Sequence, residues 1–288
     1  MNLSRRQFLA TGGAVGGILG AGIVIDAFAI EIDQVQVSRH EVPVRGLPPS
    51  LDGLKVVQVS DLHLYHGIHT AGHRALELIA AERPDLVLLT GDICEAGENL
   101  PELVDFTSGA RGRLGTYAIY GNWERSAEID DETLGAAYQK AGATLLVNQA
   151  ATIEVAGTRL SIIGLDDVLH RGANLAKAKA MTEAEDVTIW MVHEPGWVDR
   201  VPWEAAIPPA MILSGHSHGG QIRLPLLPPW LPPGCGRFVE GWYRDTYAPL
   251  YVSRGIGTAD IRARFMCPPE LPVFVLRTGP GTGAQGPD

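Results

Sequence analysis

Aspartate, asparagine and histidine side chains follow the ends of several short aliphatic runs in this sequence. Each offers an oxygen or nitrogen atom of the kind that binds divalent metal ions, and together they are too many for one tetrahedral zinc ion. Such a set suits two ions that share one carboxylate. The residues are Asp61, His63, Asp92, Asn122, His193, His216 and His218.

A centre of this kind supports a definite chemistry. Two divalent ions about 3.5–4 Å apart hold the oxygens of a phosphoryl group and lower the pKa of a water molecule, so that hydroxide is available near neutral pH. Mixed histidine and carboxylate ligands suit Mn, Fe or Zn better than Mg, which prefers all-oxygen shells. The ligand set therefore predicts two divalent metal ions as cofactors, with Mn, Fe or Zn favoured, and it is compatible with the hydrolysis of phosphate esters.

The runs that precede these residues are predicted to be buried strands, because they are continuous, aliphatic and bounded by turns. Such an arrangement delivers the side chains to the carboxyl ends of strands, where α/β folds build their sites. The sequence therefore predicts an α/β fold. The runs are residues 56–60, 86–90, 117–120, 187–192 and 211–214.

Other elements are expected between and around these strands. Helical spacing appears over 70–82 and again over 130–141, where Asp130 or Asp131 is the expected N-cap and Gly142 the stop. Residues 35–44 alternate as a strand does, and 152–155 and 159–165 flank Gly157 as a hairpin would.

The composition bounds the partners. The chain has 288 residues and a formal net charge of −10. No nucleic-acid-binding surface is expected, since phosphate backbones are bound by clustered Lys and Arg. A phosphate substrate is compatible with the acidic balance because bound metal ions supply local positive charge. The three cysteines have no metal-binding spacing and are expected to be free and partly buried.

The first 29 residues have the pattern of a twin-arginine export signal. Arg5 and Arg6 precede an uncharged apolar stretch that runs from Phe8 to Ile25, and Ala27-Phe28-Ala29 is a small-x-small cleavage site. At about 18 residues the stretch is at the short end of what spans a bilayer, so cleavage and retention as an anchor are both open.

The predicted export signal determines where the protein is expected to act and where its folded domain is expected to begin. The twin-arginine export machinery is an expected partner, and the protein is expected to be periplasmic or membrane-anchored on the outer side of the cytoplasmic membrane. Residues 30–277 are expected to form one domain and 278–288 a disordered tail.

The order of the motifs resembles the signature of the calcineurin-like metallophosphoesterases. The resemblance spans about residues 55–277 and implies a metallophosphoesterase-type four-layer β-sandwich flanked by helices. It implies that Asp61, His63 and His218 hold one ion. It also implies that Asn122, His193 and His216 hold the other and that Asp92 bridges the two. The matching motifs are Asp61-Leu62-His63, Gly91-Asp92, Gly121-Asn122, His193 and Gly215-His216-Ser217-His218.

Further segments resemble the exported, membrane-associated phosphodiesterase branch of that family. They are residues 215–221 and 251–257, followed by 268–270. The resemblance implies a phosphodiesterase that acts outside the cytoplasmic membrane, on a lipid or envelope substrate. A related branch cleaves pyrophosphate bonds in nucleotide-linked lipid precursors, but those are cytoplasmic and export weakens this alternative.

One position departs from the family pattern. Trp123 follows Asn122 where the family usually has a histidine that protonates the leaving oxygen. Losing a general acid typically costs about 10²–10⁴-fold in rate, and less when the leaving group is a stable anion. His66, His69 and His73 are alternative acids or merely surface histidines, and Trp123 could instead stack on the substrate. The competing interpretation is a metal-containing binding protein with negligible turnover.

Two features near the last motif bear on the substrate. Residues 224–233 form an apolar, proline-rich loop that could contact acyl chains or a bilayer surface, or fold over its own domain. Arg223 and Arg254 could bind a phosphate oxygen, although such arginines often form structural ion pairs.

Overall fold

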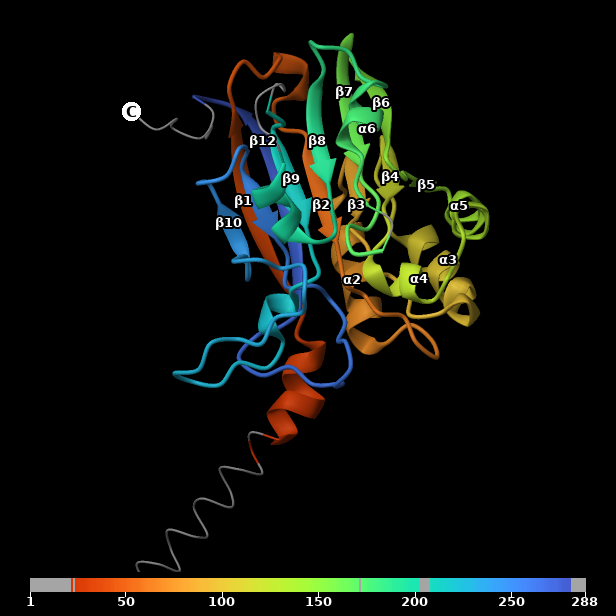
Figure 1. Ribbon diagram of the computed structural model, residues 1–288, viewed down its shortest axis with the longest axis vertical. Helices are drawn as coiled ribbons and strands as arrows, with labels where there is room; N and C mark the ends of the chain where they lie inside the picture. The colour runs from red at the N-terminus through yellow and green to blue at the C-terminus, as the bar shows by residue number, and fades with distance from the viewer. Residues whose placement is uncertain (1–21, 23, 171, 202–207, 281–288) are drawn as a thin grey trace, which may run out of the picture.

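The structure is a computed structural model that describes residues 22, 24–170, 172–201 and 208–280. The predicted twin-arginine motif therefore lies outside the described residues. Within the described part, no helix is both long and apolar enough to cross a membrane. Two six-stranded mixed sheets face each other (Figure 1).

The first sheet carries the helices on its outer face. Its strands β2, β3, β4 and β5 are parallel, β12 runs antiparallel to β2, and β1 pairs parallel with β12. Helices α2 (Thr70–Glu82), α3 (Leu100–Gly109), α4 (Asn122–Ser126) and α5 (Asp131–Lys140) connect the parallel strands. The strand order is β1 (Gln36–Val44), β12 (Glu270–Thr278), β2 (Lys55–Val59), β3 (Leu86–Leu89), β4 (Gly115–Ala118) and β5 (Thr144–Leu145).

The second sheet is mixed in the same way. Strands β7, β8, β9 and β11 are parallel, and β6 and β10 are antiparallel at the two edges. Its order is β10 (Gly241–Tyr243), β11 (Leu250–Val252), β9 (Met211–Ser214), β8 (Val187–Met191), β7 (Thr158–Gly164) and β6 (Gln149–Val155). The shorter helical segments are α6 (Leu175–Lys179), η1 (Asp26–Ile30), η2 (Glu31–Asp33), η3 (Pro49–Leu51), η4 (Gly97–Asn99), η5 (Pro195–Arg200) and η7 (His218–Gly220).

Successive side chains of each strand pack into different layers of the sandwich. In β2, Val57 belongs to the buried cluster that includes Ile79 of α2, whereas Val56 belongs to the cluster between the sheets with Leu213 of β9. Successive strand residues point to opposite faces, so each sheet has two buried faces. The outer face of the second sheet is covered by α6 and η5, which pack with Trp190. The predicted α/β fold and four-layer sandwich are confirmed.

Several predicted elements appear with the expected local signals. Helix α2 has the predicted bounds, and α5 begins after Asp130, whose side chain accepts a hydrogen bond of 2.8 Å from the Thr133 amide. Gly142 ends that region with φ +77°. All three cysteines are free, as predicted, and they are buried rather than partly buried.

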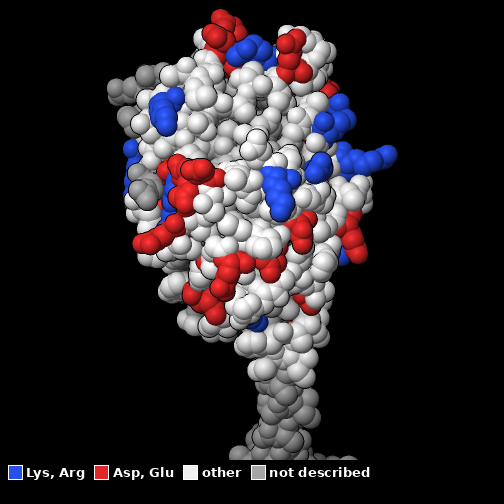
Figure 2. All heavy atoms as spheres, turned by 90° about the vertical axis from the view of Figure 1, so that its right-hand side faces the viewer, with Lys and Arg blue, Asp and Glu red and all other residues white. Residues whose placement is uncertain are grey.

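The surface charge is uneven. Figure 2 shows Lys and Arg interspersed with Asp and Glu over the upper part of one face, whereas the lower end of the described surface is mostly uncharged. This end lies below the carboxyl ends of the parallel strands, where the predicted ligands gather (Figure 1).

Candidate metal centre

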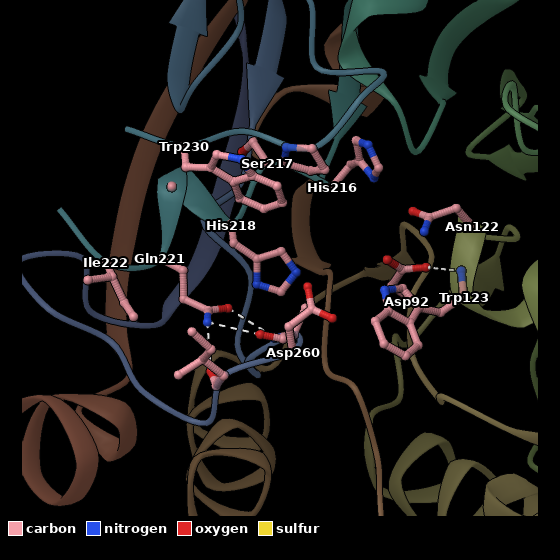
Figure 3. Close-up of a pocket in the computed structure, with 14 residues that line it drawn as sticks. Asp92, Asn122, Trp123, His216, Ser217, His218, Gln221, Ile222, Trp230 and Asp260 are labelled. Carbon is pink, nitrogen blue, oxygen red and sulfur yellow. Dashed lines mark hydrogen bonds between the residues drawn. The ribbon is translucent and has the colours of Figure 1, made fainter. Parts of the chain in front are cut away.

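The predicted ligands come from five strand ends in both sheets. Asp61 and His63 follow β2, Asp92 follows β3, and His193 follows β8. Asn122 begins α4 after β4, while His216 and His218 follow β9. The carboxyl ends of the parallel strands meet at one edge of the sandwich, so the two sheets contribute the two halves of one site. Figure 3 shows Asp92, Asn122, His216 and His218 around a common space.

The side chains form two buried groups. Asp61, His63 and His218 offer ligand atoms within 4.8 Å of one another, and so do Asp92, His193 and His216. The first group is the set that the resemblance assigns to one ion. The second group combines His193 and His216, assigned to the other ion together with Asn122, with Asp92, which is assigned to the bridge. The Oδ2 atom of Asp92 lies 3.0 Å from Nε2 of His193 and 3.8 Å from Nε2 of His63. Asp92 therefore touches both groups, as a bridging ligand must.

The backbone at this site is held in an unusual conformation. Left-handed φ angles are uncommon for residues other than glycine, and they concentrate where tertiary structure forces them at functional sites. Five of the seven predicted ligands have φ between 50° and 70°. They are Asp61, His63, Asp92, His216 and His218.

Glycines precede the ligands because the backbones approach closely. A Cβ atom on Gly121 would overlap Oδ1 of Asp92, and one on Gly215 would overlap Ser60 and Asp61. Glycine is therefore required at positions 121 and 215, because neighbouring side chains occupy the space that a Cβ atom would need.

Hydrogen bonds orient the histidine rings. Nδ1 of His193 lies 2.7 Å from the Thr90 carbonyl oxygen, and Nε2 of His216 lies 2.7 Å from that of Pro233. Each carbonyl accepts from the ring nitrogen beside it, which leaves the other nitrogen free to bind a metal. The amide of His216 also donates to Oδ1 of Asp61 over 2.8 Å and joins the two halves.

The electrostatics suit cations. Burial lowers the pKa of His218 well below its usual value and that of His216 to about 4, so both rings are neutral. Burial also disfavours the charged form of His193, but the carboxylates of Asp92 and Asp61 raise its pKa well above the usual value. The centre thus attracts positive charge.

Among the predicted ligands, two buried oxygens lack hydrogen-bond partners in the described part of the chain: Oδ2 of Asp61 and Oδ1 of Asn122. Buried polar atoms without hydrogen bonds are costly, and a metal ion would satisfy both. The residues present therefore fit two divalent ions.

Comparison with known proteins settles the family. Residues 54–224 match the Calcineurin-like phosphoesterase superfamily domain. The chain belongs to this superfamily. This metallophosphoesterase is 30% identical to the uncharacterized metallophosphoesterase YkuE of Bacillus subtilis, over 96% of this chain and 98% of that protein. It is 27% identical to the phosphodiesterase YaeI of Escherichia coli, over 95% and 99% of the two chains. It is also 28% identical to the UDP-2,3-diacylglucosamine pyrophosphatase LpxG of Chlamydia trachomatis, over 77% and 83%.

The metallophosphoesterase has a pocket of about 430 Å³ beside this centre. Its lining includes the predicted ligands Asp92, Asn122, His216 and His218 together with the apolar residues Ile222, Trp230 and Ile261. Figure 3 shows Ile222 and Trp230 on the side of the pocket away from Asp92 and Asn122. None of the described residues that line this pocket is Lys or Arg, and Asp260 is the one titratable lining residue outside the predicted ligands. The pocket therefore pairs a metal-binding floor with apolar walls.

Trp123 lines the same pocket. Its indole ring meets the imidazole of His63 edge-on, with ring centroids 5.2 Å apart. Trp123 thus occupies space next to a predicted ligand of the phosphoesterase, where it presents an apolar surface and no side-chain acid.

The alternative acids lie elsewhere. His69 caps α2, accepting a hydrogen bond from the Gly72 amide, and its Nε2 lies 2.8 Å from the Leu62 carbonyl oxygen. His66 and His73 are exposed. None of the three is among the described residues that line the pocket with Trp123. These three histidines thus lie outside the pocket that Trp123 lines, and a role for one of them as a substitute acid stays a prediction.

Arg223 and Arg254 also lie outside that lining. Both Nη atoms of Arg223 pair with Glu240, at 2.8 and 2.7 Å, while Nε of Arg254 lies 3.6 Å from both Glu240 and Glu270. The structure thus places them in ion pairs, and their binding of substrate stays a prediction.

Glu124 is a supporting residue that sequence reasoning missed. Its buried carboxylate accepts hydrogen bonds from the amides of Asp92, Ile93, Cys94 and Gly121, at 2.6–3.2 Å. Burial and the nearby Asp92 raise its pKa to about 7. A glutamate at the third position of a helix that starts after Gly121 is the available signal, because such residues bond back to the helix start.

Proposed function

We propose that this metallophosphoesterase is a dinuclear phosphodiesterase. The observation that carries the proposal is the pairing of the two buried His and Asp groups with an apolar-walled pocket that lacks Lys and Arg among its described lining residues. When bound, two divalent ions supply a water activated for attack on phosphorus. Seven side chains would hold these ions, and five of them lie on backbone with left-handed φ angles.

The pocket favours diesters over monoesters. A monoester carries a second negative charge, and no cationic side chain among the lining residues would offset it, while Asp260 would oppose it. A diester carries one charge and a second ester group, which the apolar walls of Ile222, Trp230 and Ile261 can contact. The name of the E. coli relative YaeI agrees with this proposal.

Trp123 restricts the leaving group. With no side-chain acid at that position, departure depends on a leaving group that is stable as an anion or takes its proton from water. The proposed substrates are therefore diesters with a phenolate-like or phosphate-like leaving group. The LpxG relative is named for pyrophosphate cleavage, in which the departing group is itself a phosphate.

We further propose that the enzyme acts outside the cytoplasmic membrane on an envelope substrate. Arg5, Arg6 and the apolar stretch to Ile25 support export by the twin-arginine machinery, which carries folded proteins and so lets the metals be acquired before export. The protein would then be periplasmic, or anchored on the outer side if the segment is retained.

The test uses the full chain, stripped of metal and reloaded separately with Mn²⁺, Fe²⁺ or Zn²⁺. Hydrolysis of bis-p-nitrophenyl phosphate is compared with that of p-nitrophenyl phosphate, and the metals per chain are counted. Faster turnover of the diester, dependent on metal, is expected. Faster monoester turnover would contradict the diester assignment.

A second candidate function is a metal-containing protein that binds phosphate esters without hydrolysing them. The observation that favours it is Trp123, which stands where the family has its general acid. Two bound metals per chain with no turnover of either ester would place this candidate first. The seven ligand side chains alone do not separate the two functions, because binding and hydrolysis need the same centre.

A further inference from the structure

Exposed apolar side chains gather at one end of the protein. In the described part of the chain, the exposed large apolar residues include Val24, Ile25, Phe28 and Ile30, then Leu224, Leu226, Leu227 and Trp230, and finally Ile261 and Met266. Trp230 is 72% exposed, which is unusual for so large an apolar side chain. We call the exposed apolar side chains of segments 24–30, 224–230 and 261–266 the apolar end.

The three segments form one built surface. The Arg264 amide donates to the Ala27 carbonyl oxygen over 2.9 Å, and the buried Glu31 carboxylate accepts from the amides of Met266 and Cys267. These bonds fasten the N-terminal segment to the last loop. Figure 1 shows the red N-terminal segment beside the blue and cyan loops at the bottom of the molecule.

The middle segment is fastened to the last one as well. Ile222 forms a bridge with Phe265, and the side-chain amide of Gln221 donates to the carbonyl oxygens of Ala259 and Ile261. Hydrogen bonds thus connect segments that are distant in the sequence, so that their apolar side chains lie on one surface.

The apolar end is continuous with the mouth of the metal pocket. Trp230 and Ile261 belong to both, since each lines the pocket and is largely exposed. A surface that covered the apolar end would therefore also meet the pocket opening.

The chemistry of the apolar end fits a lipid bilayer. Its side chains are Trp, Phe, Leu, Ile, Met and Val, which insert at the boundary between headgroups and acyl chains. The nearby cations Arg223 and Arg262 are paired with Glu240 and Glu95. With a net charge of −10, attraction to anionic lipids would be weak, and the driving force is apolar burial.

The N-terminal sequence points to the same partner. Residues 8–25 are an uncharged apolar stretch, and the chain that follows joins the protein within the apolar end. A segment that enters or adjoins a membrane would therefore bring this end against the bilayer. On the face that Figure 2 shows, the lower end of the described surface carries few charged side chains.

We infer that the apolar end docks on a lipid bilayer and holds the mouth of the metal pocket at the membrane surface. Phosphate esters of membrane lipids would then reach the centre from the bilayer itself. The docking rests on the exposed surface, whereas the choice of a lipid ester also rests on the proposed phosphodiesterase function.

Tryptophan fluorescence tests the docking. The full chain is reconstituted in phosphatidylcholine vesicles whose acyl chains are brominated, since bromine quenches tryptophans that enter the bilayer. The chain has six tryptophans and none lies in residues 1–30, so the N-terminal segment itself is silent. We expect clear quenching that Trp230→Phe largely removes and that Trp242→Phe, on β10, retains.

Quenching that is absent, or equal in the wild type and the Trp230→Phe variant, would overturn the docking. Chemical cross-linking in the vesicles checks whether the wild type instead dimerises through Trp230. Cross-linked dimers without quenching would assign the apolar end to contact with a second copy of the chain, and this result would also overturn the docking. Docking driven by apolar burial is also expected to persist at high salt.

Activity separates docking from catalysis. A double variant Leu226→Glu and Leu227→Glu, which are outside the pocket lining, should lose about tenfold or more on vesicle-borne phosphatidyl-p-nitrophenol. It should keep wild-type turnover of soluble bis-p-nitrophenyl phosphate. Leu169→Glu with Met181→Glu, also exposed but remote in sequence from the apolar end, is the matched control. If the double variant lost the same fraction of its activity on both substrates, the inference would be contradicted. If the wild type showed quenching but hydrolysed neither substrate, the docking would stand and the proposed phosphodiesterase function would be wrong.

Discussion

The backbone amide of Trp123 donates a hydrogen bond of 2.8 Å to Oδ1 of Asp92. The residue that replaces the family histidine therefore still positions the carboxylate that touches both metal groups. This contact needs only the backbone N–H, so any residue except proline can provide it at position 123. The substitution consequently removes an acid without dismantling the centre.

Trp123→His is expected to raise turnover in a way that depends on the leaving group. A histidine here would face the pocket and could protonate a departing alkoxide, with a gain of up to about 10²-fold for poor leaving groups and little for p-nitrophenolate. Rates are measured for aryl and alkyl diesters of graded leaving-group pKa. Trp123→Phe is the control, and a flat response across the series would show that Trp123 does not limit proton transfer.

Asp92→Asn is expected to abolish activity and the retention of both metals. The carboxylate lies between His193 and His63, so its charge acts on both groups. Metal content per chain and diester hydrolysis are measured beside Asp105→Asn, an exposed aspartate of α3. A variant that keeps two metals and full turnover would remove Asp92 from the bridge.

Glu124→Gln is expected to weaken both the fold and the metal centre. Each carboxylate oxygen of Glu124 accepts from two backbone amides, those of Asp92 and Gly121 at one oxygen and those of Ile93 and Cys94 at the other. Glutamine keeps one accepting oxygen and replaces the other with an NH₂ group, so two of these amides lose their acceptor, and each buried amide left unpaired costs about 1–3 kcal/mol. Disturbing a group that holds a ligand typically costs about 10–100-fold in metal affinity. Urea unfolding and metal titration are compared with Glu132→Gln on the exposed side of α5, and unchanged affinity would limit Glu124 to a structural role.

Asp186→Asn is expected to destabilise the fold at neutral pH but not in acid. Burial by itself would raise the pKa of Asp186, but hydrogen bonds from Arg159 and Ser161 hold it below its usual value. A carboxyl group with a depressed pKa stabilises the fold above its unfolded value of about 3.9, and this contribution is lost as the pH falls through the folded pKa.

Melting temperatures of the wild type and the Asp186→Asn variant, measured in EDTA between pH 7 and pH 3, check this prediction. The difference should shrink as the pH falls. Glu154→Gln, an exposed residue of β6, serves as the control. A difference that stays constant over this range would show that the carboxylate charge at 186 does not matter.

Local sequence determined the elements that present the ligands. Helix α5 could be predicted because Asp130 and Gly142 are signals read within a few residues of the helix ends. The strand ends that carry Asp61, Asp92 and His193 could be predicted because continuous aliphatic runs must be buried. The seven predicted ligand positions came from these local patterns together with the family resemblance, and the structure brings their side chains to one site.

Tertiary structure alone decided what surrounds them. Glu124 supports residues 92–94 from another strand end, and Glu240 engages Arg223, contacts that no local pattern specifies. The parallel pairing of β1 with β12 likewise joins the two ends of the domain.

The apolar end shows the same division most plainly. The sequence by itself determined that residues 8–25 and the loop 224–233 are apolar, because composition is local. Only the fold decided that segments 24–30, 224–230 and 261–266 form one surface at the pocket mouth, because hydrogen bonds such as Arg264 to Ala27 join residues more than two hundred positions apart. Non-local contacts of this kind depend on how both sheets pack, so they cannot be predicted from the periodicity of the sequence.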